Sequence, residues 1–458
     1  MSPQTPSSKG RGGAARERCA AEGRPRIETW QPPRSTITAV VYQSTVAACR
    51  GLGTIGALQK NHRSNRATLH STAPTPERAF LVAVQLRSQT TGLDADASLE
   101  ELALLAYTAG AEVVGSTVQR LESPHPAHYI GKGKLEEVVE ARDETGYTMV
   151  IFDDELSPSQ QRNLENALNV KVLDRTALII DIFARRARTK EARLQVELAQ
   201  FEYLLPRLAG QWSHLERLEG RIGTRGPGET QLETDRRLVR NRLTRLKREI
   251  DDVRRQRELH RRRRKRQGMH VVALVGYTNA GKSTLLEALS GDHLFTEDLL
   301  FATLDPVTRR VHMPSGHDVL WTDTVGFIQK LPTQLVASFR ATLEELSDAD
   351  VLVHLVDITH SNAEEQYQTV ERTLDELGLA GKTRVVAFNK VDMLAGKGSS
   401  PDGLESIEYA LKAAEGAPLR EHPEAVLISA AREWHLDSLL RTVETELAEV
   451  DARQPALA

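Results

Sequence analysis

The chain contains 458 residues, 40% of them hydrophobic and 27% charged, and its formal net charge is −3. This balance is typical of two or three globular domains. No apolar run approaches the ~18 residues that suggest a membrane span, so we expect no stable membrane insertion. Both cysteines lie in the first 49 residues and the fourteen histidines show no ligand spacing. Neither a disulfide framework nor a metal site built from these residues is therefore supported.

The charge is strongly segregated along the chain. The balance is +8 in residues 1–75, −9 in 76–182, +13 in 183–268 and −15 in 269–458. The first block is rich in Arg, Ser, Thr, Gly and Ala, which predicts a disordered basic extension. An organelle transit peptide has a similar composition, although three glutamates argue against one, and an upstream start codon chosen in error explains the block equally well.

Residues 76–182 alternate apolar runs with amphipathic stretches. We predict strands at 80–86, 113–118, 149–152 and 170–173, and helices at 99–109, 135–142 and 157–167. This alternation indicates a small α/β domain with a parallel sheet. The segment Gly131-Lys132-Gly133-Lys134 is either a basic loop that contacts a phosphate backbone or a plain strand-to-helix turn.

Residues 183–268 contain two stretches with apolar residues at steps of three and four, which predicts two helices with matching seams. The seams are Leu194, Leu198, Phe201, Leu205 and Leu208, and Val239, Leu243, Leu246, Ile250 and Val253. Residues 220–230 between them are too rich in glycine for a helix, so we predict an antiparallel hairpin with Arg221 and Arg225 in its tip. The charge of +13 indicates a polyanionic partner, or alternatively a solvated helix face.

Residues 269–458 begin with an apolar run, 270–275, that predicts a buried strand. The next residues, 276–283, read Gly-Tyr-Thr-Asn-Ala-Gly-Lys-Ser and fit the phosphate-loop pattern G-x-x-x-x-G-K-[ST]. The glycines let the backbone N–H groups point at a phosphate chain, and the helix predicted at 284–290 directs its positive end toward it. Lys282 is expected to reach the β- and γ-phosphates, and the Ser283 hydroxyl is expected to bind magnesium.

Four further motifs, among them the segment with Thr303, follow the phosphate loop in the order that a GTPase requires. Asp323-Thr324-Val325-Gly326 ends a strand predicted at 318–322, where Asp323 would hold magnesium through water and the Gly326 N–H would contact the γ-phosphate. Thr303, after Phe301 and Ala302, lies where a switch threonine would bind the metal. Asn389-Lys390-Val391-Asp392 follows a strand predicted at 384–388, and its aspartate would accept two hydrogen bonds from guanine. Ser429 and Ala430, after a strand predicted at 425–428, would complete the base pocket, and a closing helix is predicted at 436–447.

The residue after Gly326 is Phe327, where many GTPases carry a glutamine that orients the attacking water. A phenylalanine has no group for this task, so we expect slow hydrolysis by the isolated protein. The alternative interpretation is that Phe327 only packs against a neighbour.

Several motifs together resemble the HflX family of GTPases. They are residues 129–134, 153–158, 223–229 and 323–327, and the resemblance covers about residues 77–450. It implies an N-terminal α/β domain, a helical hairpin and a P-loop GTPase domain. It also implies a cytoplasmic protein, expected to be a monomer, that binds the large ribosomal subunit and ribosomal RNA and splits or rescues stalled ribosomes. Arg221 departs from the glycine expected in the family's hairpin tip.

The resemblance also adds a cofactor. Asn279 occupies the position at which several glutamine-lacking GTPases hold K⁺, so the predicted cofactors are Mg²⁺ and, through Asn279, K⁺, with GTP as the substrate. The structural alternative is that Asn279 only braces the loop. A GTPase subunit of an RNA-modifying complex is the second functional hypothesis, but that class should carry a one-carbon-cofactor domain or a catalytic cysteine, and no cysteine follows residue 49.

The predicted site has three sets of residues. Lys282, Thr303 and Gly326 are predicted to act in hydrolysis. Ser283, Thr303 and Asp323 are the predicted metal ligands. The predicted nucleotide contacts are Gly276, Tyr277, Thr278, Asn279, Ala280, Gly281, Lys282, Ser283, Thr284, Phe301, Ala302, Thr303, Asp323, Thr324, Val325, Gly326, Asn389, Lys390, Asp392, Ser429 and Ala430.

Overall fold

The computed structural model describes residues 77–87, 95–207, 227–266, 268–291, 300–331, 345–394 and 422–453, with side chains of the longest helix described over 236–259. The predicted disordered extension and the hairpin tip with Arg221 and Arg225 lie outside these ranges. Within them, no helix combines the length and apolar character needed to cross a membrane.

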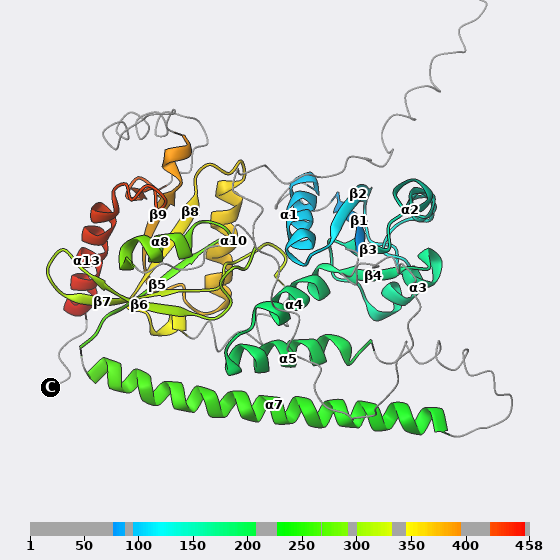
Figure 1. Cartoon of the computed structure of the whole chain (residues 1–458), viewed down its shortest axis with the longest axis horizontal. Coiled ribbons are helices and arrows are strands. Elements are labelled where there is room, and N and C mark those ends of the chain that lie inside the picture. Colours follow the sequence, from blue (N-terminus) through cyan, green and yellow to red (C-terminus); the bar gives the residue numbers. More distant parts are fainter. Residues whose placement is uncertain are drawn as a thin grey trace, which may run out of the picture.

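The N-terminal domain is a four-stranded parallel sheet between two layers of helices (Figure 1). The strand order is β2-β1-β3-β4, with β1 Arg78–Leu86, β2 Glu112–Leu121, β3 Met149–Phe152 and β4 Lys171–Asp174. Alternate residues of β1 face opposite cores, so α1 (Ala95–Thr108) and α4 (Arg175–Arg186) cover one face, and α2 (Lys132–Thr145) and α3 (Pro158–Leu168) cover the other. The four predicted strands and three predicted helices are confirmed. The sequence analysis missed α4, which extends across the boundary predicted between residues 182 and 183.

The segment 131–134 is the start of a helix rather than a loop. Because α2 begins at Lys132, the predicted start at residue 135 is three residues too late. The Lys134 side chain is buried, and its Nζ lies 2.5 Å from Glu137 Oε2. Lys134 is therefore not presented to a phosphate backbone, whereas the Lys132 side chain is 90% exposed, so the structure does not decide between the two interpretations of this segment.

The predicted hairpin forms from α5 (Lys190–Leu204) and α7 (Pro227–Arg266), which lie antiparallel along one side of the molecule (Figure 1). Leu194 and Leu198 of α5 pack with Leu246 and Ile250 of α7 in one buried cluster. The sequence prediction was wrong about residues 227–230, which are helical rather than part of the loop. Proline is favoured in the first turn of a helix, where its missing N–H costs nothing.

The C-terminal domain contains a six-stranded sheet in the order β10-β9-β8-β5-β7-β6, in which only β6 is antiparallel to its neighbour. The strands are β5 Val271–Gly276, β6 Val307–His312, β7 Asp318–Asp323, β8 Val351–Asp357, β9 Thr383–Asn389 and β10 Val426–Leu427. Helices α8 (Lys282–Ser290) and α13 (Leu436–Arg453) cover one face, and α10 (Ala363–Glu376) lies on the other. A 3₁₀ turn, Val391–Met393, follows β9. The predicted helices at 284–290 and 436–447 are confirmed, whereas β6, β8 and α10 were not predicted.

One hydrophobic core joins the two α/β domains. Buried residues of α1 and α4 belong to the same cluster as residues on the α10 face of the second sheet. After β5, the chain forms β6 and β7 on one side of this strand and then crosses to β8 on its other side. The carboxyl end of β5 is therefore a topological switch point. Ligands of open α/β sheets bind at such points.

Candidate active site

The phosphate loop connects β5 to α8 at that switch point. Gly276 has φ +152°, and a Cβ atom there would lie 2.3 Å from the Leu355 carbonyl oxygen. Gly281 has φ +95°, and its Cβ would lie 2.3 Å from Asn389 Nδ2. Both positions therefore require glycine, which lets the loop pack against β8 and β9. Asn279 lies between them in a left-handed conformation, φ +62°, with an exposed side chain.

Lys282 is buried beneath this loop. Its Nζ donates to the carbonyl oxygens of Gly276 at 3.1 Å and Tyr277 at 2.8 Å. Burial lowers the pKa of Lys282 from 10.5 to about 8, although the nearby Asp323 carboxylate acts in the opposite direction. Because burial penalises the ammonium form, an anion placed against Nζ would raise this pKa and bind tightly.

The three predicted metal ligands converge. The hydroxyls of Ser283 and Thr303 both donate to Asp323 Oδ2, at 2.6 and 2.8 Å, and their oxygens are 2.9 Å apart. Burial raises the pKa of Asp323, and Lys282 opposes that shift. Asp323 Oδ1 is also buried and has no hydrogen-bond partner among the described residues.

These oxygen donors fit Mg²⁺, which prefers hard oxygen ligands and usually binds through one or two carboxylates together with substrate phosphates. Within the described ranges, no group of three or more His, Cys, Asp or Glu side chains could hold a metal ion. The mixed hydroxyl and carboxylate group is therefore the metal candidate that the geometry offers.

The predicted base-pocket residues also lie together. Asn389 Nδ2 donates to the Ala280 carbonyl at 2.9 Å, and Asn389 Oδ1 accepts from the Ala430 N–H at 2.9 Å. This one side chain therefore ties the phosphate loop to the segment after β10. Ser429 Oγ donates to Asp392 Oδ1 at 2.7 Å, which orients the carboxylate that would face the base. The remaining predicted contacts, Thr284, Ala302, Thr324, Val325 and Lys390, lie in the segments that carry these groups.

The segment after β7 is fixed to the phosphate loop. A Cβ on Gly326 would lie 2.9 Å from Thr278 Cα and 3.0 Å from Lys282 Nζ, so only glycine allows this approach. The Phe327 N–H donates to the Gly276 carbonyl at 3.1 Å, and the Thr278 N–H donates to the Phe327 carbonyl at 2.8 Å. The Phe327 side chain is 2% exposed and belongs to the core between the domains. This arrangement favours the packing interpretation of Phe327.

Tyr277 extends from the phosphate loop into the N-terminal domain. Its hydroxyl hydrogen-bonds to the buried Glu101 carboxylate of α1 and accepts from the Gln329 N–H at 2.9 Å. Glu101 is also paired with Arg175 of α4. Burial raises the pKa of Tyr277 to about 12 and lowers that of Arg175 to about 10. The N-terminal domain thus contacts both the phosphate loop and the segment after β7.

A second contact completes this buried cluster. Lys330 lies 2.5 Å from Asp153 Oδ2 and 2.6 Å from Asp154 Oδ1, and Arg175 lies 2.6 Å from Asp153 Oδ1. Burial raises the pKa of Asp153, and Lys330 opposes the shift. Sequence reasoning did not place Glu101 or Arg175 near the nucleotide site. A usable signal was Asp153-Asp154 at the carboxyl end of β3, where polar side chains of a parallel sheet gather.

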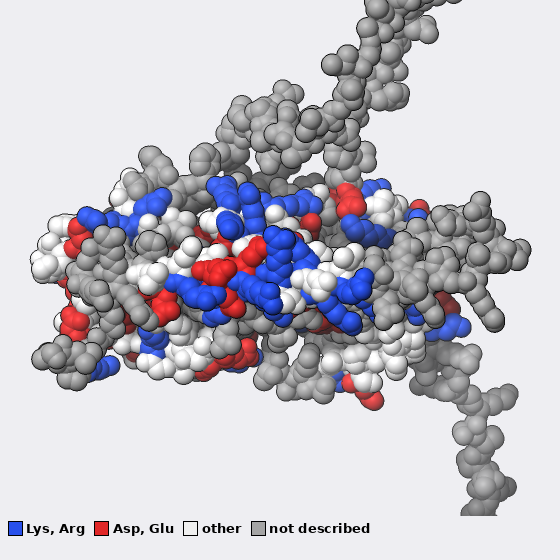
Figure 2. Space-filling model, turned by 90° about the horizontal axis from the view of Figure 1, so that it is seen from below, with Lys and Arg blue, Asp and Glu red and all other residues white. Residues whose placement is uncertain are grey.

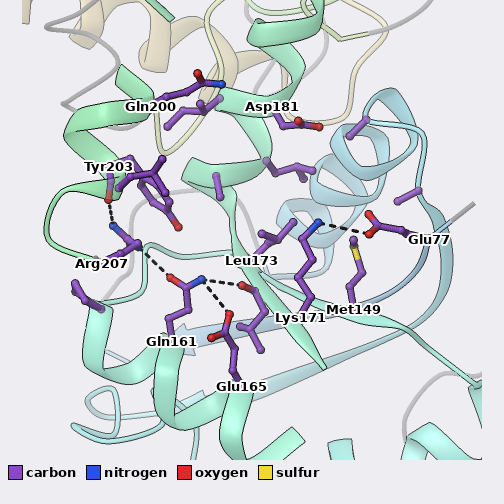
Figure 3. Close-up of a pocket in the computed structure, with 18 of the residues that line it drawn as sticks. Glu77, Met149, Gln161, Glu165, Lys171, Leu173, Asp181, Gln200, Tyr203 and Arg207 are labelled. Atoms are coloured by element: carbon purple, nitrogen blue, oxygen red, sulfur yellow. Dashed lines mark hydrogen bonds and ion pairs between the residues drawn. The ribbon is translucent and has the colours of Figure 1, made fainter. Parts of the chain in front are cut away.

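A cavity of about 660 Å³ lies between α3, α4, α5 and the free edge of β4 (Figure 3). Arg207 Nε donates to Gln161 Oε1 at 2.9 Å, and Gln161 Nε2 donates to the Val172 carbonyl on that edge at 2.9 Å. Lys171 lies 3.5 Å from Glu77 across the opening. These polar groups of the wall are already paired with one another, so we assign the cavity no ligand.

Comparison with known proteins gives matches along most of the chain. The family models described as GTP-binding GTPase N-terminal, GTP-binding GTPase Middle Region and 50S ribosome-binding GTPase match residues 96–184, 186–264 and 271–390. A protein described as GTPase HflX from Caldanaerobacter subterraneus subsp. tengcongensis is 47% identical over 371 residues, which cover 81% of each chain. The Escherichia coli K12 protein of the same description is 46% identical over 65% of this chain and 70% of its own. A crystal structure of a GTP-binding protein from Sulfolobus solfataricus in complex with GDP is 24% identical, with a TM-score of 0.40, over 82% of this chain and 99% of that one.

Proposed function

This chain belongs to the HflX family of GTPases and hydrolyses GTP, and from that premise we propose that it acts in the cytoplasm on the large ribosomal subunit, splitting or rescuing stalled ribosomes. The observation that carries this proposal is a basic helix, α7, attached to a nucleotide site through α5 and the domain core. GTP binding and hydrolysis would then drive or time the action of the protein on the ribosome.

For hydrolysis, we assign the phosphate chain to the N–H groups of the loop 276–281 and to Lys282. Ser283, Thr303 and Asp323 would hold Mg²⁺, which neutralises charge on the β- and γ-phosphate oxygens when bound. Gly326 would donate its N–H to the γ-phosphate, and Asp392 would select guanine. Asn279, whose side chain is exposed on the loop, would hold K⁺ against the phosphates, a role that the family resemblance implies.

Phe327 leaves the site without a water-orienting amide. Its side chain is buried and its backbone is bonded to the phosphate loop on both sides, so a simple rotation does not bring any polar group of this residue to the γ-phosphate. We infer that the isolated protein hydrolyses GTP slowly and that the ribosome supplies or orders the group that orients the attacking water.

The polyanion-binding surface is assigned to α7. Of the side chains described on this helix, ten are Lys or Arg and four are Asp or Glu, and Figure 2 shows the basic residues gathered across the face that α7 forms. Many of them pair with acids, as Arg242 does with Glu197. Arg237, Arg240 and Arg248 are exposed and have no ion pair with a described residue. We call these three the basic face, and phosphate contacts are its expected role.

The test is sedimentation with purified large ribosomal subunits in the presence of a non-hydrolysable GTP analogue. Replacing the three arginines of the basic face with glutamine should weaken binding and reduce the salt slope by up to about three phosphate contacts. The matched control replaces Arg120, Arg372 and Arg441, which are equally exposed but lie on β2, α10 and α13. Equal affinity and salt slope for the two triple variants would refute the assignment of the surface. No binding by the unmodified protein would refute the ribosome as partner.

A further inference from the structure

The segment that carries Thr303 is bound to the start of the hairpin through Asp305. Asp305 Oδ2 accepts from the Arg188 N–H at 2.9 Å and from the Thr189 N–H at 3.1 Å, and Oδ1 accepts from the Thr189 hydroxyl at 2.5 Å. Thr189 is itself the N-cap of α5, because its Oγ1 accepts from the Ala192 N–H at 3.1 Å. A carboxylate placed against unsatisfied N–H groups at a helix N-terminus is favoured by both hydrogen bonds and the helix dipole.

The residues on the other side of Thr303 are bound to the same part of the N-terminal half. The ring of Phe301 packs edge-on against Phe183 of α4, with centroids 4.7 Å apart and planes at 80°. Phe301 and Leu304 are 2% exposed in the core shared by the two domains. Thr303 is therefore held from both sides by contacts with the junction between α4 and α5.

We propose that Asp305 is a positioning residue for GTP hydrolysis, which holds Thr303 at the metal and thereby links the nucleotide site to α5. This inference rests on the assignment of Thr303 to the metal under the proposed function. Two residues span at most about 7 Å, so fixing the Asp305 carboxylate restricts where the Thr303 hydroxyl can lie. A ligand that is ordered before binding loses less entropy on binding, so the metal complex forms at lower magnesium concentration.

The coupling must also act in the opposite direction. If the contacts of Asp305 with residues 188 and 189 favour the metal complex, the metal complex favours these contacts by the same factor. The first turn of α5, which leads to the seam with α7, is therefore more protected when GTP and Mg²⁺ hold Thr303. When Thr303 is released, Asp305 is free to leave α5.

The test compares Asp305→Ala with Thr303→Ala. The first measurement is the magnesium concentration that half-saturates the binding of a non-hydrolysable GTP analogue. We expect Asp305→Ala to raise it about tenfold, equivalent to about 1.4 kcal/mol, and Asp305→Asn, which keeps one acceptor oxygen, to raise it less. GDP affinity without magnesium should not change. The second measurement is amide hydrogen exchange of residues 188–192, which needs no catalysis. Protection should rise with the analogue and Mg²⁺ in the unmodified protein and should not rise in Asp305→Ala.

The outcomes separate the inference from its premise. If Thr303→Ala leaves the magnesium requirement unchanged, the metal assignment is wrong. If Thr303→Ala changes it and Asp305→Ala does not, the assignment holds and the positioning role of Asp305 is overturned. If Asp305→Ala only loosens residues 188–192, the residue is a helix cap and nothing more. Thr189→Ser, which keeps the hydroxyl partner and the N-cap, should behave as the unmodified protein in both measurements.

Discussion

The pKa of Lys282 predicts that GTP binding takes up a proton above neutral pH. This side chain is buried against two carbonyl oxygens, and burial lowers its pKa to about 8. A phosphate chain beside Nζ favours the charged form and raises the pKa again. Binding must therefore be accompanied by protonation of every molecule in which Lys282 is neutral, and affinity must fall as pH rises through 8.

The size of the effect follows from the value of the pKa. With a pKa of about 8, about a tenth of the free protein carries neutral Lys282 at pH 7 and about three-quarters does at pH 8.5. The number of protons taken up per molecule of analogue bound should therefore rise from about a tenth at pH 7 to about three-quarters at pH 8.5. The dissociation constant should increase by about fourfold over this interval, because only the protonated fraction binds productively.

Isothermal titration calorimetry of a non-hydrolysable GTP analogue, in buffers with different ionisation enthalpies, measures this proton count directly. The matched control is Lys282→Arg, since a guanidinium does not lose its proton in this range. The Lys282→Arg variant should bind the analogue more weakly at both pH values. Its affinity should be the same at pH 7 and pH 8.5, because residue 282 stays protonated at both. A pH-independent affinity and no proton uptake at pH 8.5 in the unmodified protein would refute the reasoning.

Four further predictions concern residues in different parts of the structure. Asp392→Asn should lose affinity for GTP and gain affinity for xanthosine triphosphate, and an unchanged preference in competition binding would contradict the base-pocket assignment. Leu246→Ala should lower the free energy of unfolding by about 3 kcal/mol in denaturant titrations, because the side chain is fully buried between α5 and α7, whereas Leu238→Ala, 58% exposed on the same helix, should have little effect. Asn279→Ala should abolish any stimulation of ribosome-dependent turnover when potassium replaces sodium at constant ionic strength, and equal rates in the two salts would make Asn279 a structural residue. Tyr277→Phe should cost about 1–3 kcal/mol of stability, because it removes a partner from the buried Glu101 carboxylate, and an unaltered unfolding midpoint would argue against that contact.

The geometry of the proposed nucleotide site could be predicted from the sequence because its motifs are short, contiguous and adjacent to strand ends. The phosphate loop needs glycine at two positions where a Cβ would lie 2.3 Å from a neighbouring atom, and those positions are the two glycines of the motif. The side-chain oxygens of Ser283, Thr303 and Asp323 lie within 2.9 Å of one another. Ser283 and Asp323 follow the parallel strands β5 and β7, whose carboxyl ends share one edge, whereas Thr303 was placed only by its position between these two motifs.

Elements with ambiguous patterns were missed. The central strand β8 reads Val-Leu-Val-His-Leu-Val-Asp, and its His354 is fully buried and bonded to Glu371 at 2.9 Å. A polar residue inside an apolar run weakens the expectation of a buried strand. Here the hydrogen-bond partner that satisfies the buried histidine comes from the helix α10, which lies outside the strand's own sequence. The helix α4 was missed because it begins at Arg175, directly after β4 ends at Asp174, so no turn residues separate the two elements in the sequence.

Apart from Asp153-Asp154 at the end of β3, the contacts between the domains had no signal in local sequence. Glu101 lies on the buried side of an ordinary amphipathic helix, where a glutamate reads as a surface residue at the margin of the core. Its partners are Tyr277, 176 positions away, and Arg175, and the three form one buried group only after both domains have packed. Asp305 is only half-buried, but its partners at the start of α5 are likewise distant in sequence, 116 and 117 residues away. Local motifs predict the chemistry of the GTPase, whereas the proposed coupling to the hairpin depends on which charged side chains the packing of the two domains brings together.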